Sequence, residues 1–266
     1  MERGETGSRV LAAFPAIAFA VFIVARGGIV FTLGLILLGV LALGELYRMM
    51  YQARPVNLAG FVALAGMCVA AQYGDQYQVL LVLSASVPLC YFLAVMRPWR
   101  ENVSWGIAAT VFGIVWIGIP FATAVLLRGL DHGGALVIDT LIGTFIGDTA
   151  AYFGGRAWGQ RQIAPRISPN KTLEGLISGF VGGTFAFWLF AKAYQHDWFH
   201  GTDALIIGAC VAAIAPVGDL FESMVKRDLQ IKDSGRFFGA HGGVLDRLDA
   251  VFFSIVVAYY VSRAVL

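Results

Sequence analysis

The sequence predicts an all-α integral membrane protein, a polytopic bundle of about nine transmembrane helices. The mean hydropathy is +0.74. Of the 266 residues, 58% are hydrophobic and only 14% are charged. The apolar residues also form several runs of about 20, which is the length that an α-helix needs to cross a bilayer. The net charge of +2 is too small to indicate a nucleic-acid partner.

The apolar runs follow one another with short connections. We expect spans at 10–26, 29–46, 57–72, 77–96, 104–127, 134–155, 174–194, 203–222 and 248–265. The first run follows two arginines, as in a signal peptide, but we interpret it as a retained helix because a second run begins directly after Gly28. The three cysteines lie far apart inside apolar runs and are expected to pack as small hydrophobic side chains.

The basic residues predict the orientation in the membrane. If the N-terminus is cytoplasmic and the spans alternate, 15 of the 19 lysines and arginines fall in cytoplasmic segments and four on the opposite side. Cytoplasmic loops of membrane proteins are enriched in these residues. We therefore expect a multi-pass protein of the cytoplasmic (inner) membrane, surrounded by membrane lipids, with its C-terminus on the opposite side. The polar loops 156–173 and 223–247 then face the cytoplasm.

The chemistry is concentrated in the second half of the chain. Residues 1–130 carry polar side chains mostly at turns, such as the stretch from Glu45 to Arg54, and are predicted to be transmembrane scaffold. The sequence leaves open whether this half forms a homodimer surface or only fills the bilayer. Residues 131–266 are predicted to contain the catalytic helices and both cytoplasmic loops.

The sixth span contains two acidic residues, Asp139 and Asp148. A charged residue at the centre of a membrane helix costs about 2.5–3.5 kcal/mol on insertion scales, so such a residue is a functional candidate. Asp148 lies nearer the cytoplasmic end, among glycines that permit close helix approach. We predict a functional role for Asp148 and a structural one for Asp139.

A charged, glycine-rich stretch lies between the last two spans. The part from Lys226 to Asp249 holds nine charges. Helical spacing places Asp219, Glu222, Ser223 and Lys226 in one stripe, and Asp246 and Asp249 on one face of the next helix. Carboxylates at two helix ends can hold a hard divalent cation. Lysines and arginines between them can bind phosphate oxygens. Any one of these charges alone is better explained by a solvated membrane loop with charges at helix ends; the whole set favours a binding site.

The loop before the seventh span offers a second cationic group. We expect a turn at Ser168-Pro169, which places Asn170, Lys171 and Thr172 near the start of the next helix. Free backbone N–H groups and a cation at a helix N-terminus suit a phosphate. The alternative is that the basic residues of this loop only anchor it at anionic headgroups.

The segment from Ser223 to Asp249 resembles the C-terminal signature of the phosphatidate cytidylyltransferase (CDP-diacylglycerol synthase) family. All of its fixed positions are met, namely by Ser223, Lys226, Arg227, Lys232, Asp233, Gly235, Phe238, Gly239, His241, Gly242, Gly243, Asp246, Arg247 and Asp249. Two upstream segments, 147–152 and 167–175, are also similar, but Asn170 and Leu173 depart from the lysine and tryptophan of many members. The resemblance covers residues 140–266; over 1–130 only the hydrophobic layout matches.

This resemblance implies that CTP and phosphatidate react to give CDP-diacylglycerol and pyrophosphate, and that the reaction uses Mg²⁺. Whether a second cation takes part is left open. It implies Asp219 and Asp246 as leading metal ligands, with Asp148, Glu222 and Asp249 as further candidates. The phosphate contacts it implies are Lys226, Arg227, Lys232, Arg236 and Arg247, completed by Ser168, Asn170, Lys171, Thr172 and Ser223. The triplet His241-Gly242-Gly243 is expected to form a tight turn near the nucleotide, with the role of His241 in proton transfer left open.

Two other functions remain open at this point. A CTP-dependent lipid kinase needs similar lysines and metals but releases CDP in place of pyrophosphate. An ion-coupled transporter could use Asp139 and Asp148 as an ion path, but the polar residues cluster on one side of the membrane, which favours an enzyme. The sequence contains no G-x-x-x-x-G-K-[ST] phosphate loop and no pair of adjacent aspartates.

Overall fold

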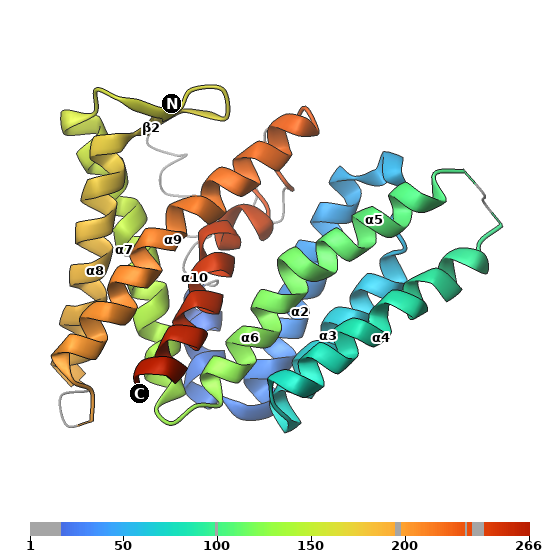
Figure 1. The fold of residues 1–266 in the computed structure, drawn as a ribbon, viewed down its shortest axis with the longest axis horizontal. Coiled ribbons are helices and arrows are strands. Elements are labelled where there is room, and N and C mark those ends of the chain that lie inside the picture. The colour runs from blue at the N-terminus through green and yellow to red at the C-terminus, as the bar shows by residue number, and fades with distance from the viewer. Residues whose placement is uncertain (1–16, 99–100, 195–197, 232, 236–241) are drawn as a thin grey trace. The chain divides into compact units, whose positions relative to one another are not determined.

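The structure is a computed structural model that describes residues 17–98, 101–194, 198–231, 233–235 and 242–266. The chain folds into two compact units (Figure 1). Unit 1 consists of Met1–Gly129 and Ile231–Arg247, and unit 2 of Leu130–Gln230 and Leu248–Leu266. The chain therefore passes from unit 1 to unit 2, returns to unit 1, and ends in unit 2.

Unit 1 is built almost entirely from apolar helices. In chain order these are a helix at Ile17–Arg26, α2 (Gly28–Met49), the 3₁₀ turn η1 (Tyr51–Ala53), α3 (Asn57–Tyr73), α4 (Gln76–Val95), α5 (Val103–Gly113), the π-helical turn η2 (Ile114–Gly118) and α6 (Ile119–Arg128). The turn η2 ends two residues before Pro120. Proline cannot donate to the carbonyl four residues earlier, and a π-turn accommodates this loss without ending the helix.

The core of unit 1 forms where α2, α3 and the α5–η2–α6 helix pack together. Leu43, Leu64 and Ile117 are completely buried there. One polar side chain links the elements across this core: Thr110 Oγ1 accepts the backbone N–H of Val56 at 2.6 Å. Because lipid offers no replacement partner, such a buried backbone N–H must be satisfied within the protein.

Unit 2 contains the longest helices. Its elements are α7 (Gly133–Trp158), β1 (Gln162–Ala164), β2 (Ser168–Thr172), α8 (Leu173–Tyr194), α9 (Gly201–Asp228) and most of α10 (Leu245–Val265). Helix α8 packs against both α7 and α9 (Figure 1). The two strands pair antiparallel, with Gln162 opposite Thr172 and Ala164 opposite Ser168.

The prediction of a turn at Ser168-Pro169 is wrong. Both residues belong to strand β2, and the chain reverses at residues 165–167. Pro169 is tolerated because the hairpin has only two strands and leaves an unpaired edge for the residue that cannot donate. The prediction that Thr172 lies at the start of a helix is confirmed, since α8 begins at Leu173.

Glycines bring α7 and α8 into direct backbone contact. A Cβ atom on Gly183 would lie only 2.8 Å from the carbonyl oxygen of Gly143, and one on Gly147 would lie 3.3 Å from that of Gly179. Small residues allow this approach, and van der Waals packing then holds helices together in lipid. The glycines flanking Asp148 therefore have the packing role that their spacing predicts.

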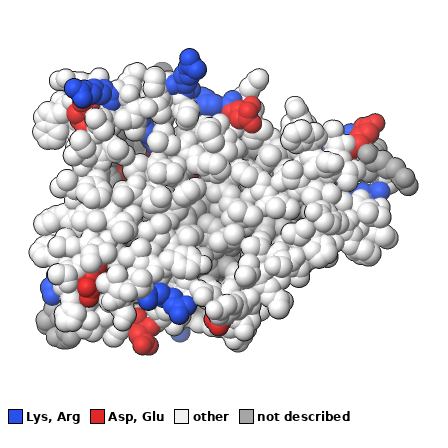
Figure 2. Space-filling view, in the orientation of Figure 1, with Lys and Arg blue, Asp and Glu red and all other residues white. Residues whose placement is uncertain are grey.

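Seven helices are long and apolar enough to cross a membrane within the described residues. Six of them match predicted spans within about three residues, and α9 extends six residues beyond its predicted end. The predicted span 57–72 corresponds to the shorter apolar helix Asn57–Tyr73. Of the predicted span 10–26, residues 17–26 form the helix Ile17–Arg26 and residues 10–16 lie outside the described residues. On the visible face, the charged side chains of each unit lie near helix ends, and the surface along the helices is largely uncharged (Figure 2). This is the surface of a multi-pass membrane protein.

We expect Gly183→Val to destabilise the protein by about 1–3 kcal/mol, because the new side chain would force α7 and α8 apart. Thermal unfolding in detergent measures the change. Gly44→Ala is the control, since the nearest atom to its Cβ, Phe61 Cζ, lies 3.9 Å away. Equal melting temperatures for wild type and Gly183→Val would contradict this account of the α7–α8 contact.

Candidate active site

Three carboxylates from three helices of unit 2 form an acidic cluster. Asp148 lies on α7, Asp219 on α9 and Asp249 on α10. Each interacts electrostatically with the other two. Gly218 lets α9 approach α10 here, because a Cβ at this position would overlap the carbonyl oxygen of Asp249. Three residues far apart in the sequence thus come together at one place.

A lysine from the hairpin enters this acidic cluster. Lys171 lies on β2, and its Nζ is 2.7 Å from Oδ2 of Asp219. The lysine side chain is 21% exposed and the aspartate 38%, so the pair is partly shielded from water. Lys171 also interacts with Asp148. The pairing of β1 with β2 therefore has a consequence for the site: it delivers a cation to the carboxylates.

The predicted polar stripe on α9 is present. Ser223 Oγ donates to Asp219 at 3.4 Å, and Lys226 Nζ contacts Glu222 Oε2 at 2.6 Å. Glu222 is buried, with 1% of its side chain exposed. Glu222 also shares a hydrogen bond with Asp249, which interacts electrostatically with Lys226. The stripe is therefore continuous with the acidic cluster.

The residues of the acidic cluster fit a hard divalent cation in chemistry. Carboxylate oxygens are the ligands that Mg²⁺ prefers, and three carboxylates that repel one another favour a cation among them. In the part of the chain that the structure describes, no three His, Cys, Asp or Glu groups already converge on one point.

Asp246, the other predicted leading ligand, is placed in unit 1 and binds its own segment. Its two oxygens accept the backbone N–H of Ser234 at 3.2 and 3.0 Å, and Oδ2 accepts that of Gly243 at 2.8 Å. Gly242 adopts a φ of +80°, which a residue with a side chain rarely does. Asp246 therefore fixes the backbone before α10, a role that sequence spacing did not indicate.

Glu45 is the residue that sequence reasoning missed. It lies inside α2, only 2% exposed, and is not the turn residue it was predicted to be. Its Oε2 accepts the backbone N–H of Leu245 at 3.0 Å and the hydroxyl of Ser234 at 3.4 Å. The available signal was an ionisable residue within an apolar run, the same signal that selected Asp148.

The remaining predicted residues lie around the hairpin and the ends of α9 and α10. Thr172 Oγ1 accepts the N–H of Gly175 at 3.2 Å and so caps α8. Arg227 Nε donates to the carbonyl of Ile167 at 3.4 Å, which links α9 to the hairpin turn. Asn170 and Arg247 are exposed, and Ser168 is half-buried. Lys232, Arg236 and His241 lie outside the described residues.

Asp139 has no part in the acidic cluster as described. It is completely buried and accepts a short hydrogen bond from the hydroxyl of Tyr194, which joins α7 to the end of α8. A carboxylate with this partner stabilises the packing of two helices. Beyond the end of α8, Trp198 stacks on His132 at a centroid distance of 4.0 Å.

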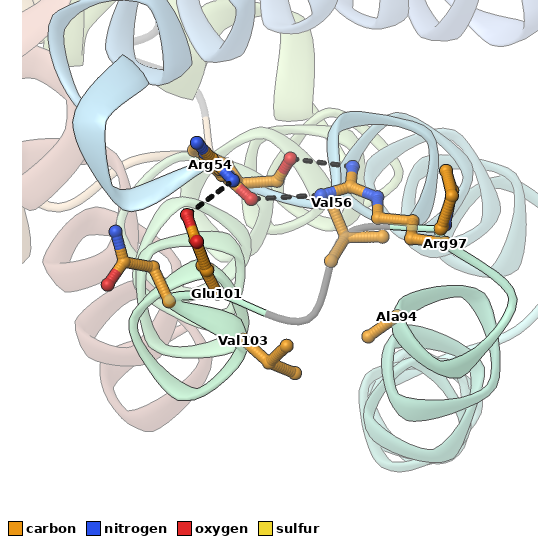
Figure 3. A pocket seen from close by; sticks show the side chains of 10 residues that line it. Arg54, Val56, Ala94, Arg97, Glu101 and Val103 are labelled. Carbon is orange, nitrogen blue, oxygen red and sulfur yellow. Dashed lines mark hydrogen bonds and ion pairs between the residues drawn. The ribbon is translucent and has the colours of Figure 1, made fainter.

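A pocket of about 510 Å³ lies in unit 1, between the ends of α3, α4 and α5 (Figure 3). Arg97 crosses it and donates to the backbone carbonyls of Arg54 and Pro55 at 2.9 and 2.7 Å. Arg54 pairs with Glu101 at 3.6 Å in an exposed contact. None of the residues that line the pocket is a predicted site residue. Its cations stabilise helix ends, and we assign it no catalytic part.

Comparison with known proteins identifies the family. The chain matches the model of the Cytidylyltransferase family over residues 7–265, which is nearly its full length. The chain belongs to the cytidylyltransferase family. The match includes the N-terminal half of the chain, for which the sequence had offered only a hydrophobic layout.

Curated relatives in this family are named phosphatidate cytidylyltransferase. The one from Haemophilus influenzae is 37% identical over 144 residues, 50% of this chain and 50% of its own. The one from Mycobacterium leprae is 38% identical over 168 residues, 62% of this chain and 53% of its own. The one from Bacillus subtilis is 28% identical over 262 residues, 95% of this chain and 96% of its own. The chain thus spans about half the length of the first two relatives and nearly all of the third.

We expect Lys226→Met to destabilise the protein by about 3–5 kcal/mol, because Glu222 is left buried without its lysine. Thermal unfolding in detergent tests this. The double variant Glu222→Gln/Lys226→Met is expected to recover most of the loss. Glu101→Gln, which breaks an exposed pair, is the control and is expected to change stability by less than about 1 kcal/mol. A double variant as unstable as Lys226→Met alone would contradict the pairing.

Proposed function

We propose that this protein transfers the cytidylyl group of CTP to phosphatidate, giving CDP-diacylglycerol and pyrophosphate for phospholipid synthesis. The observation that carries the proposal is the family match over residues 7–265, joined to relatives that bear this activity in their names. The acidic cluster with Lys171 at its edge supports it, because a reaction between two polyanions needs both anionic ligands for a cation and cationic groups for phosphates.

The reaction forms one phosphorus–oxygen bond and breaks another. A phosphate oxygen of phosphatidate attacks the α-phosphorus of CTP, and the bond from that phosphorus to the oxygen that bridges to the β-phosphorus breaks. Because the attacking oxygen is already anionic near neutral pH, the protein needs no strong general base. Its task is to bring two like-charged substrates together and to stabilise the pyrophosphate that leaves.

The described residues divide this task between them. Asp148, Asp219 and Asp249 are the candidates to hold Mg²⁺, and the resemblance implies Glu222 as a further one. When bound, the ion supplies positive charge that neutralises phosphate oxygens. Lys171 and Lys226 are placed beside these carboxylates and contribute fixed cations. Thr172, the last residue of the strand that carries Lys171, caps α8, so the helix N-terminus adds its dipole to these cations.

We place this site at the cytoplasmic face of the inner membrane. The loops that contain Lys171 and Lys226 belong to the segments that collect 15 of the 19 basic residues, which are the segments expected in the cytoplasm. CTP is dissolved in the cytoplasm, and phosphatidate lies in the membrane with its headgroup at the surface. A site at helix ends on this face lets the soluble substrate meet the lipid.

The first test follows the label of CTP. Purified protein in detergent with phosphatidate and Mg²⁺ is expected to move label from the α-phosphate of CTP into the lipid phase, with equimolar pyrophosphate. Asp219→Asn is expected to lower kcat/KM at least about 100-fold, because it weakens both the cation site and the pair with Lys171. Asp203→Asn is the control, since it lies in the first turn of the same helix, several turns away from Asp219.

Two outcomes would overturn the assignment. Transfer of the γ-phosphate to a lipid alcohol, with release of CDP, would identify a lipid kinase. If neither the α-phosphate nor the γ-phosphate label of CTP is transferred, in protein that unfolds cooperatively, the enzyme assignment fails and the transporter function becomes the alternative.

The second test removes the metal. We expect EDTA to abolish cytidylyl transfer and added Mg²⁺ to restore it, because no protein cation replaces a divalent ion at three carboxylates. Asp148→Asn is expected to raise the Mg²⁺ concentration for half-maximal activity by about tenfold or more. Activity that persists after exhaustive chelation, or a Mg²⁺ requirement unchanged by Asp148→Asn, would contradict the proposed ligands.

A further inference from the structure

Glu45 stands out because nothing in the proposed chemistry explains it. It is a carboxylate inside an apolar helix, α2, and only 2% of it is exposed. An ionisable group within a membrane span is costly and is generally retained for a purpose. The described partners of Glu45 show what that purpose is, because they all belong to one short segment, Ile231–Arg247.

The first partner is the start of α10. Leu245 is the first residue of that helix, so its backbone N–H has no acceptor within the helix itself. Glu45 Oε2 accepts this N–H at 3.0 Å. A carboxylate at a helix N-terminus is favoured by the exposed N–H groups and by the helix dipole. Glu45 therefore caps α10 from a position 200 residues earlier in the chain.

The second partner lies at the other end of the segment. Ser234 Oγ is 3.4 Å from the same oxygen of Glu45, and Ser234 is itself 6% exposed. Between Ser234 and Leu245 the sequence contains Arg236 and His241, two of the residues implied in substrate binding. One carboxylate thus contacts Ser234 and Leu245, which flank these two residues in the sequence.

Two glycines bring the backbone close enough for this contact. A Cβ on Gly235 would lie 2.5 Å from Oε1 of Glu45, and one on Gly243 would overlap Oε2. The N–H of Gly243 is donated to Asp246, which also accepts the N–H of Ser234. The flanks of the segment are therefore bound by two carboxylates, one from α2 and one from α10.

We infer that Glu45 is a positioning residue for the cytidylyl transfer: it fixes Ser234 and the start of α10, and so orients Asp246 and Arg247, two residues that the resemblance implies in metal and phosphate binding. This inference rests on the proposed function. Glu45 acts through the segment and does not touch substrate. Its loss is expected to weaken binding of CTP, whose phosphates the segment is implied to contact, and to leave binding of phosphatidate nearly unchanged.

The experiment compares Glu45→Ala, Glu45→Gln and Glu45→Asp with a matched control, Thr110→Val. Thr110 is a buried polar residue of the same unit whose hydroxyl accepts a backbone N–H at 2.6 Å, but its described partners lie outside Ile231–Arg247. The control therefore reports what general loss of stability in unit 1 does. Each full-length protein is studied in detergent by hydrogen exchange, calorimetric titration with CTP and Mg²⁺, steady-state kinetics and thermal unfolding.

Three results are expected. Backbone exchange in peptides that cover Ile231–Arg247 should accelerate at least about tenfold in Glu45→Ala and stay near wild type in Thr110→Val. The Kd and the KM for CTP should rise about 10–100-fold in Glu45→Ala, while the KM for phosphatidate changes less than about twofold. Glu45→Gln retains an acceptor oxygen and should fall between wild type and Glu45→Ala, whereas Glu45→Asp is too short to reach both partners and should resemble Glu45→Ala.

The inference is overturned if exchange and CTP affinity are unchanged in Glu45→Ala, or if Thr110→Val raises the Kd for CTP as much. Should Glu45→Ala not fold, Glu45→Gln and Glu45→Asp decide the matter by the same criteria. Failure of the proposed function looks different: wild-type protein would then form no CDP-diacylglycerol. Titration with CTP and the exchange data do not depend on turnover, so they separate the two cases.

Discussion

The cost of keeping a carboxylate away from water governs how this protein is built. Four buried or half-buried acids have specific partners: Glu222 pairs with Lys226, Asp219 with Lys171, Asp139 with Tyr194, and Glu45 with backbone N–H and hydroxyl donors. Lipid cannot supply these partners, so the helices must be arranged to bring them. The helices of each unit therefore supply hydrogen-bond donors and cations to a few carboxylates. In the acidic cluster, two of the three carboxylates share the nearby cation Lys171.

Local periodicity was enough to predict much of this arrangement. Apolar runs located the spans within a few residues, and the i, i+3, i+4, i+7 spacing correctly placed Asp219, Glu222, Ser223 and Lys226 on one helix. The glycines around Asp148 predicted the close contact with α8 that the structure contains. These features depend on residues near one another in sequence, where hydrophobicity and helical geometry determine the outcome.

Features that depend on distant residues were not predicted. The hairpin that carries Lys171 was expected to be a turn at Ser168-Pro169, because two-residue turn signals say little about strand pairing. Glu45 was read as a turn residue because its partners lie 189 and 200 residues away. For the same reason the charged signature was grouped with the second half of the sequence, whereas the structure groups Ile231–Arg247 with Met1–Gly129. Hydropathy identifies spans but carries no information on which span holds which loop.

The contact between Glu45 and Leu245 also sets an order of events during synthesis. A ribosome adds about 5–20 residues per second, so roughly 10–40 s separate the emergence of the two residues. During that interval α2 is already made, but Leu245, whose N–H donates to Glu45, does not yet exist. Glu45 therefore lacks this donor until the last helix is made. The nascent chain therefore cannot close its charged signature segment before nearly every span has been made, which couples maturation of the site to completion of the membrane bundle.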